Sequence, residues 1–205
     1  TLFLHPPSYA GFDGGAGSRY QARREIRSFW YPTWLAQPAA LVPGSRVVDE
    51  PPDGLTLKDI LPLASQYELA VLHTSTPSFP HDVGVAEALK GDNPHLRLGF
   101  VGAHVAVDPE GALRASEAIE FVARNEFDFT IQEVAQGRPL RTIPGLSYRD
   151  NGHIGHTPDR PTLENMDALP FVVDVYKRDL TIDNYYIGYL LHPYVSLYTG
   201  RGCRS

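Results

Sequence analysis

Short apolar runs alternate with helix-like segments along the first two thirds of the chain, and this alternation restricts the possible folds more than any other feature. The run Leu69–Leu72 is continuously apolar, which is typical of a strand buried on both faces. Just before it, Thr56 is a good N-cap for a helix that runs to about Tyr67. Repetition of this unit predicts an open parallel sheet with helices on both faces.

The same reading places the other elements. Strands are predicted at Thr1–Leu4, Ser45–Val48, Leu69–Leu72, Leu96–Val101 and Ile119–Ala123. Helices are predicted over part of Arg19–Leu41 and at Thr56–Tyr67, Asp82–Leu89, Pro109–Ala115 and Phe129–Ala135. We therefore predict that residues 1–140 form an α/β domain, with a Rossmann-like (flavodoxin-like) five-stranded parallel sheet flanked by helices.

The pattern changes after residue 140. Two short runs, Leu146–Arg149 and His153–His156, flank an Asp-Asn-Gly turn and predict a β-hairpin. Residues 141–193 are expected to comprise this hairpin and a proline-marked linker, with a short helix near Ile182–Leu190. The apolar run Tyr194–Tyr198 predicts a strand, so that residues 194–205 would open a second domain.

Composition excludes several classes of function. The chain has 205 residues, enough for one full core, and a net charge of −6, which argues against a nucleic-acid partner because phosphate neutralisation needs clustered Lys and Arg. No apolar stretch in the sequence is long enough to span a bilayer, and Thr1–Leu4 is too short for a signal-peptide core. A single cysteine, Cys203, excludes a disulfide framework within the chain.

Candidate binding residues follow the predicted strands. In open parallel sheets, ligands bind outside the carboxyl ends of the strands, so the residues that come directly after each strand are expected to form the site. The candidates are Pro6, Ser8, His73, Thr74, Thr76, Gly102, His104, Arg124 and Glu126. A dinucleotide is excluded because the glycines of residues 11–17 lack the Gly-x-Gly-x-x-Gly spacing, and because two prolines remove amide donors from the first turn.

Two groups of these residues allow more than one interpretation. The hydroxyl-rich loop Thr74–Ser78 suits a large neutral ligand with many amides, but the same hydroxyls could instead cap a helix and form turns. His5, His73 and His104 could together bind a metal, as in a small metal-dependent enzyme, or could make separate turn hydrogen bonds.

Two further clusters carry charge and aromatic surface. Arg19, Arg23 and Arg27 would form one basic face of a helix, either for an acidic ligand or for solvent and a neighbouring domain. The aromatic residues Phe29–Tyr31 and Trp34 are expected to pack against the sheet or a partner surface, with a ligand platform as the alternative.

Several segments, taken in order, resemble a known family. They are the first strand followed by Pro-Pro, the Arg-Asn-Glu-Phe-Asp turn from Arg124, the segment Ile143–Arg149, the Leu169–Phe171 linker and the final Gly-Arg-Gly-Cys. Together they resemble class B radical S-adenosylmethionine (SAM) enzymes with an N-terminal cobalamin-binding domain. Residues 11–34 are most similar to the members associated with hopanoid biosynthesis.

The resemblance implies a set of cofactors and partners. Such an enzyme holds a [4Fe–4S] cluster on a Cys-x3-Cys-x2-Cys motif, cleaves SAM and binds cobalamin. Cys203 matches the first cluster ligand, and the sequence ends two residues later, so this chain is expected to be an inactive front portion that works with its own radical SAM barrel. The subgroup implies a hopanoid-type lipid substrate, cyclitol ether formation, a cytoplasmic location and peripheral contact of the full enzyme with a membrane.

One departure from the family leaves the cobalt ligand open. Many cobalamin domains carry Asp-x-His-x-x-Gly, and this sequence has no such motif. The lower axial position would then be open or filled by water, His73 or another group. The same absence is consistent with a degenerate domain that binds no cofactor and instead docks substrate or a partner.

Overall fold

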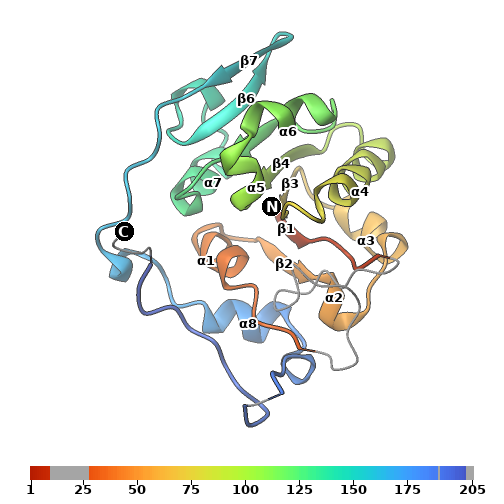
Figure 1. The fold of residues 1–205 in the computed structure, drawn as a ribbon, viewed down its shortest axis with the longest axis vertical. Helices are drawn as coiled ribbons and strands as arrows, with labels where there is room; N and C mark the ends of the chain where they lie inside the picture. The colour runs from red at the N-terminus through yellow and green to blue at the C-terminus, as the bar shows by residue number, and fades with distance from the viewer. Residues whose placement is uncertain (10–27, 189, 202–205) are drawn as a thin grey trace.

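A computed structural model describes residues 1–9, 28–188 and 190–201 of the chain. Its centre is a seven-stranded sheet in the order β2-β1-β3-β4-β5-β6-β7 (Figure 1). The strands are β1 (Leu2–His5), β2 (Arg46–Asp49), β3 (Leu69–His73), β4 (Arg97–Val101), β5 (Phe121–Ala123), β6 (Leu146–Asp150) and β7 (His153–His156). The first five are parallel and the last two antiparallel, so the predicted α/β fold is confirmed.

Helices cover both faces of the sheet (Figure 1). They are α1 (Thr33–Leu41), α2 (Glu50–Asp53), α3 (Leu57–Ala64), α4 (Phe79–Asp92), α5 (Ala103–Val107), α6 (Pro109–Ala115), α7 (Asp128–Ala135) and α8 (Val173–Asp179). Short 3₁₀ turns lie at Leu140–Thr142, Met166–Ala168 and Ile182–Asn184.

Alternation along the strands creates two separate cores. In β1, Phe3 packs on one face with residues of α1, α7 and α8, whereas Leu2 and Leu4 pack on the other with residues of α3 to α6. All three side chains are fully buried. A continuously apolar strand is therefore required at this position, because neither face of the sheet centre is open to water.

Local sequence signals account for several element ends. The backbone N–H of Thr56 donates to the Asp59 carboxylate at 2.8 Å, which completes the predicted cap of α3. In the hairpin, Asn151 and Gly152 both have positive φ (49° and 86°), as a two-residue type I′ turn requires.

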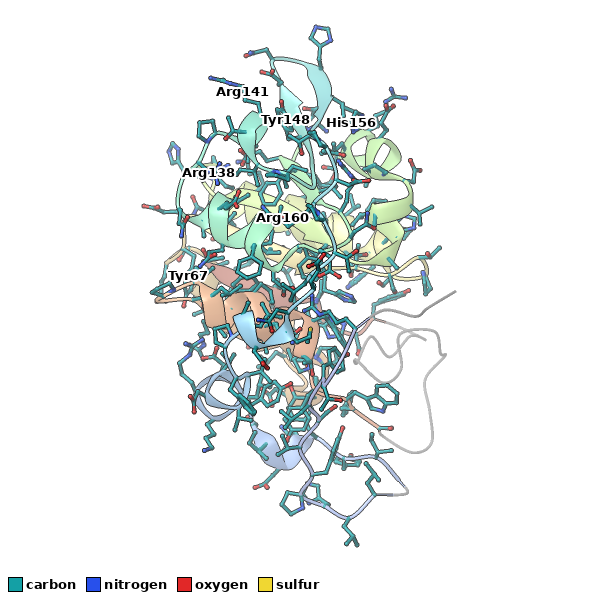
Figure 2. All side chains as sticks on the ribbon, turned by 90° about the vertical axis from the view of Figure 1, so that its left-hand side faces the viewer. Tyr67, Arg138, Arg141, Tyr148, His156 and Arg160 are labelled. Atoms are coloured by element: carbon teal, nitrogen blue, oxygen red, sulfur yellow. The ribbon has the colours of Figure 1, made fainter. Side chains whose placement is uncertain are left out.

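The hairpin lies within the main sheet. β6 pairs with β5, with Val122 opposite Ser147, so the hairpin extends the five predicted parallel strands to seven (Figure 1). Figure 2 shows Tyr148 and His156 on this hairpin. The unpaired edge of β5 would otherwise expose backbone donors and acceptors, and β6 satisfies them.

Two predicted elements differ in the structure, and helices α2 and α5 were not predicted. The helix expected near Ile182–Leu190 is only the 3₁₀ turn Ile182–Asn184, while α8 forms earlier, where Val175 and Tyr176 enter the core. The run Tyr194–Tyr198 forms no strand, because an extended segment needs a hydrogen-bonded neighbour to become one and none pairs with it among the described residues.

The aromatic segment before α1 behaves largely as predicted. Phe29 and Tyr31 are buried, and the Tyr31 ring stacks on Tyr185 with centroids 4.4 Å apart, while Trp30 stays exposed. The predicted basic face of Arg19, Arg23 and Arg27 lies outside the described residues. Within the ranges that the structure describes, no helix is both long and apolar enough to cross a membrane.

Candidate functional site

A pocket of about 320 Å³ lies at the carboxyl ends of β3, β4 and β5. It is lined by Trp34, His73, Gly102, Ala103, Ala106, Asn125, Phe127 and Tyr198. The parallel strands have the order β2-β1-β3-β4-β5, the flavodoxin-like order, in which chain direction across the sheet reverses between β1 and β3. The pocket therefore lies beside the switch point, at the edge where such folds bind ligands.

Two ring side chains, those of Trp34 and His73, lie together in the lining of the pocket. His73, the last residue of β3, is 7% exposed, and its ring centroid lies 5.1 Å from that of Trp34 on α1. The His5 ring lies 5.5 Å from that of His73 and 6.4 Å from that of Trp34, edge-to-face to both, so the three rings form one cluster. The His73 imidazole thus reaches the pocket between two other rings.

Gly102 allows the backbone after β4 to approach the backbone after β3 closely at the edge of the pocket. Its φ of +122° is a conformation that residues with a side chain rarely adopt, and a Cβ there would lie 2.2 Å from the Thr74 carbonyl oxygen. The Thr74 N–H in turn donates to the Val101 carbonyl at 3.0 Å. On this side of the pocket, α5 presents only the small side chains of Ala103 and Ala106, which leave space for a ligand.

The turn between β5 and α7 has two different faces. Asn125, with a positive φ of 50°, and Phe127 line the pocket. Glu126 and Asp128, which alternate with them, bind the guanidinium of Arg201. One face of this turn thus contacts whatever occupies the pocket, and the other holds the C-terminal segment.

Of the nine residues predicted to bind a cofactor, the structure brings two into the pocket, His73 and Gly102. Pro6 is buried beside β1, Ser8 and Thr76 are exposed, and His104 packs on Phe79 with ring centroids 4.5 Å apart. The prediction from strand ends did not include Ala103, Ala106, Phe127 or Tyr198. Trp34 also lines the pocket, in line with the alternative in which the aromatic cluster forms a ligand platform. Asn125 was within reach of sequence reasoning, since it is the second residue after β5.

Most hydroxyls of the loop Thr74–Ser78 already have hydrogen-bond partners in the loop itself or in helix α4. The Thr74 and Ser78 hydroxyls donate to the Asp82 carboxylate at 2.6 and 2.8 Å, and the Ser75 and Ser78 hydroxyls bond each other at 2.9 Å. Burial raises the pKa of Asp82 to about 6, and the two hydroxyl donors oppose that rise. These bonds favour the interpretation in which the hydroxyls form the local turn, and Thr74 does not line the pocket.

Arg124 braces the hairpin and does not face the pocket. Its guanidinium donates to the carbonyl of Leu146 at 2.5 Å, to the Ser147 hydroxyl at 2.6 Å and to the carbonyl of Thr157 at 2.6 Å, and it pairs with Asp159 at 2.9 Å. The side chain is 10% exposed. This placement does not support the predicted ligand role of Arg124, because the guanidinium is already bound to groups of the hairpin and the segment that follows it.

The three predicted histidines do not converge on one point. His5 Nδ1 bonds Asp49 at 2.7 Å, and the second Asp49 oxygen accepts from the Tyr185 hydroxyl at 2.8 Å. Across the described ranges, no group of three His, Cys, Asp or Glu residues is placed to hold a metal ion. The hypothesis of a metal-dependent enzyme built on His5, His73 and His104 therefore finds no support in their geometry.

A buried carboxyl lies next to this network. Glu50, the first residue of α2, is fully buried, and neither of its carboxyl oxygens has a hydrogen-bond partner among the described residues. Burial, together with the nearby Asp49, Asp82 and Asp59 carboxylates, raises its pKa to about 9. Glu50 is consequently a neutral acid at pH 7.

Comparison with known proteins places this geometry in context. The chain is 30% identical over 170 residues to an uncharacterized methyltransferase of Pyrococcus horikoshii, covering 77% of this chain and 35% of that protein. Its structure is similar to that of TsrM, a radical SAM methyltransferase from Kitasatospora setae solved with cobalamin and a [4Fe–4S] cluster bound. That similarity has a TM-score of 0.51 at 14% identity and covers 80% of this chain and 30% of TsrM.

These matches establish the fold and a relation to part of a longer protein. The chain spans about a third of the length of both relatives. No protein-family model matches the chain. At 14% identity, the likeness to TsrM shows a common α/β architecture with a mostly parallel sheet.

Proposed function

We propose that this chain is the cobalamin-binding part of a radical SAM methyltransferase, and that the pocket at the ends of β3 to β5 receives one face of the corrin ring. The observation that carries the proposal is an open pocket lined by aromatic, small and polar residues, one of them an imidazole, located where a doubly wound sheet binds its ligand. The methyltransferase name of the Pyrococcus relative and the cobalamin held by TsrM support the same assignment.

The residues of the pocket fit such a ligand. Trp34 and Phe127 supply flat apolar surface for a broad ring, and Ala103 and Ala106 leave room for it. Asn125, which is exposed at the rim, can pair with an amide arm of the cofactor. The volume of about 320 Å³ is at the low end of the range for ligand pockets, so we assign it to one face of the ring.

When bound, cobalamin supplies a cobalt centre that can carry a methyl group. The chain's own residues would position the ring and exclude water from the face that it turns toward the sheet. His73 is the described residue whose imidazole would contact the bound cofactor, since it is the only histidine among the described pocket-lining residues. We further propose that Cys203, which lies outside the described residues, is the first cluster ligand of the whole protein.

The finer substrate assignment is a separate proposal. Hopanoid side-chain modification with cyclitol ether formation rests on the resemblance of residues 11–34, most of which lie outside the described residues. Neither relative is named for a hopanoid, and both are named methyltransferases, so methyl transfer is the reaction that we propose. A hopanoid-type lipid remains a prediction, testable by offering it to the whole protein with SAM.

The proposal predicts that filling the pocket prevents corrin binding. An Ala106→Trp substitution should weaken binding of hydroxocobalamin at least about tenfold, because the indole would occupy space that the ring needs. Binding is measured by the shift of the visible spectrum and by protein-bound cobalamin after gel filtration.

Val107→Trp is the matched control. Val107 is the next residue on α5, is 87% exposed and does not line the pocket, so its substitution should leave binding unchanged. Equal binding by both variants would contradict the assignment of the pocket. Absence of binding by the unmodified chain would instead favour the alternative, a degenerate domain that binds no cofactor and docks substrate or a partner. That alternative is disfavoured because side chains do not fill the pocket.

A further inference from the structure

Arg201 joins three parts of the molecule that surround the pocket. Its guanidinium pairs with Glu126 at 2.8 Å and also bonds Asp128 in the turn after β5 and the side-chain oxygen of Gln37 on α1. The Asp128 and Arg201 side chains are only 4% and 20% exposed. A charge-assisted contact with two carboxylates in a largely dry environment is stronger than an ordinary surface ion pair.

The groups that bind Arg201 alternate with groups that line the pocket. Glu126 and Asp128 bind the guanidinium, whereas Asn125 and Phe127 face the pocket. On α1, Gln37 lies one helical turn after the pocket residue Trp34, so both side chains lie on the same side of that helix. A displacement of Arg201 would therefore act directly on two walls of the pocket, the turn after β5 and helix α1.

The segment that carries Arg201 is itself a pocket wall. Tyr198, three residues before Arg201, lines the corrin pocket and also a second, more apolar pocket of about 500 Å³ beside Leu169–Val172. The segment has no regular secondary structure. It is attached through tyrosines upstream, where the Tyr31 hydroxyl donates to the Tyr194 carbonyl at 2.8 Å and that of Tyr176 to the Ser196 carbonyl at 3.2 Å.

We propose that Arg201 is a positioning residue that holds Tyr198 as a wall of the corrin pocket and fixes the segment leading to Cys203 beside that pocket. The tyrosines attach one end of residues 194–201, and the ion pairs with Glu126 and Asp128 attach the other. The identity of the ligand rests on the proposed function, but the anchoring of the segment does not.

The ion pairs of Arg201 couple ligand binding in the pocket to the anchoring of residues 194–201. A ligand that packs against Asn125, Phe127 and Tyr198 stabilises the conformation that binds Arg201, so it should also strengthen the contacts of Arg201 with Glu126 and Asp128. Thermodynamic linkage is reciprocal. If ligand binding stabilises the Arg201 contacts by some factor, loss of those contacts must lower the affinity for the ligand by the same factor.

Cys203 allows the coupling to be measured, because it is the only cysteine of the chain and takes a thiol-specific nitroxide label. Electron paramagnetic resonance of the labelled chain should show a slow component, which hydroxocobalamin increases. Arg201→Gln should lose that component and bind hydroxocobalamin at least about fivefold more weakly. Arg201→Lys should be intermediate, since an ammonium cannot bridge both carboxylates and the amide in one fork.

Two further variants complete the test. Glu126→Gln removes a partner of Arg201 without altering residue 201, and should also increase label mobility. Arg114→Gln is the control, because it breaks an exposed ion pair with Glu110 on α6 and should change neither signal. Thermal unfolding of each variant identifies any that fails to fold, and Glu126→Gln then replaces Arg201→Gln as the test.

The outcomes separate this inference from the proposed function. Equal label mobility in the unmodified chain and in both Arg201→Gln and Glu126→Gln would overturn the anchoring role. Unchanged cobalamin affinity in Arg201→Gln would overturn its coupling to the pocket. If no variant binds cobalamin but the mobility contrast persists, the cofactor assignment fails while the anchoring role of Arg201 stands.

Discussion

Replacing Arg124 with methionine is expected to lower the free energy of unfolding by about 3 kcal/mol, because the change leaves buried acceptors without their donor. The guanidinium donates to the Thr157 carbonyl at 2.6 Å and to the Ser147 hydroxyl at 2.6 Å, and both acceptors belong to buried residues. Methionine keeps much of the side-chain volume and provides no donors. Urea denaturation followed by circular dichroism measures the change.

The same substitution separates a structural role from a ligand role. Arg141→Met is the control: Arg141 is exposed, and Figure 2 shows it near the hairpin, so its loss should cost little stability. Arg124→Met should bind hydroxocobalamin nearly as well as the unmodified chain under conditions where both are folded. Normal stability with lost binding would contradict the hairpin role and restore Arg124 as a cofactor residue.

Replacing Glu50 with glutamine is expected to remove a large part of the pH dependence of stability. The unfolded chain loses the Glu50 proton near pH 4.5, whereas burial and the Asp49, Asp82 and Asp59 carboxylates hold the folded-state pKa at about 9. Between these values the folded state holds a proton that the unfolded state has released. Its stability therefore falls as pH rises, by roughly 4 kcal/mol for every three pH units, and levels off above pH 9.

The measurement is the free energy of unfolding of both proteins at pH 5 and pH 8. The unmodified chain should lose about 4 kcal/mol more than Glu50→Gln over this interval. Asp82, whose pKa is raised to about 6, adds a similar decline at the acidic end in both proteins and cancels in the comparison. Glu87→Gln, at an exposed position of α4, is the control and should follow the unmodified chain. Parallel pH profiles for Glu50→Gln and the unmodified chain would contradict a buried neutral Glu50.

Features that depend on neighbours in sequence were predictable. Apolar runs gave the five parallel strands, because a strand buried on both faces must be apolar throughout. The cap at Thr56 and the turn at Asn151 and Gly152 were predictable for the same reason, since their hydrogen bonds and φ angles involve residues at most three positions apart. The edge of the sheet that carries the pocket also followed, because parallel strands end together.

Which side chain faces the ligand did not follow from sequence. Arg124, Asn125 and Glu126 are consecutive, yet the first braces the hairpin, the second lines the pocket and the third binds Arg201. The roles of Arg124 and Glu126 are decided by partners 22 and 75 residues away along the chain, Leu146 and Arg201. No local pattern distinguishes these partners, since any of the three polar side chains could face solvent equally well.

The C-terminal third shows the same division most clearly. Its hairpin was predictable, but helix α8 forms where Val175 and Tyr176 reach the core, and the tyrosine-rich segment after it is held by bonds to residues near the start of α1. The sequence by itself determined the parallel sheet, the alternation of strands and helices along the chain, and the edge of the sheet where the proposed binding pocket lies, because these follow from hydrophobic periodicity and chain connectivity. The tertiary structure alone decided the pocket walls and the anchoring of Arg201, because both depend on contacts between segments that only folding brings together.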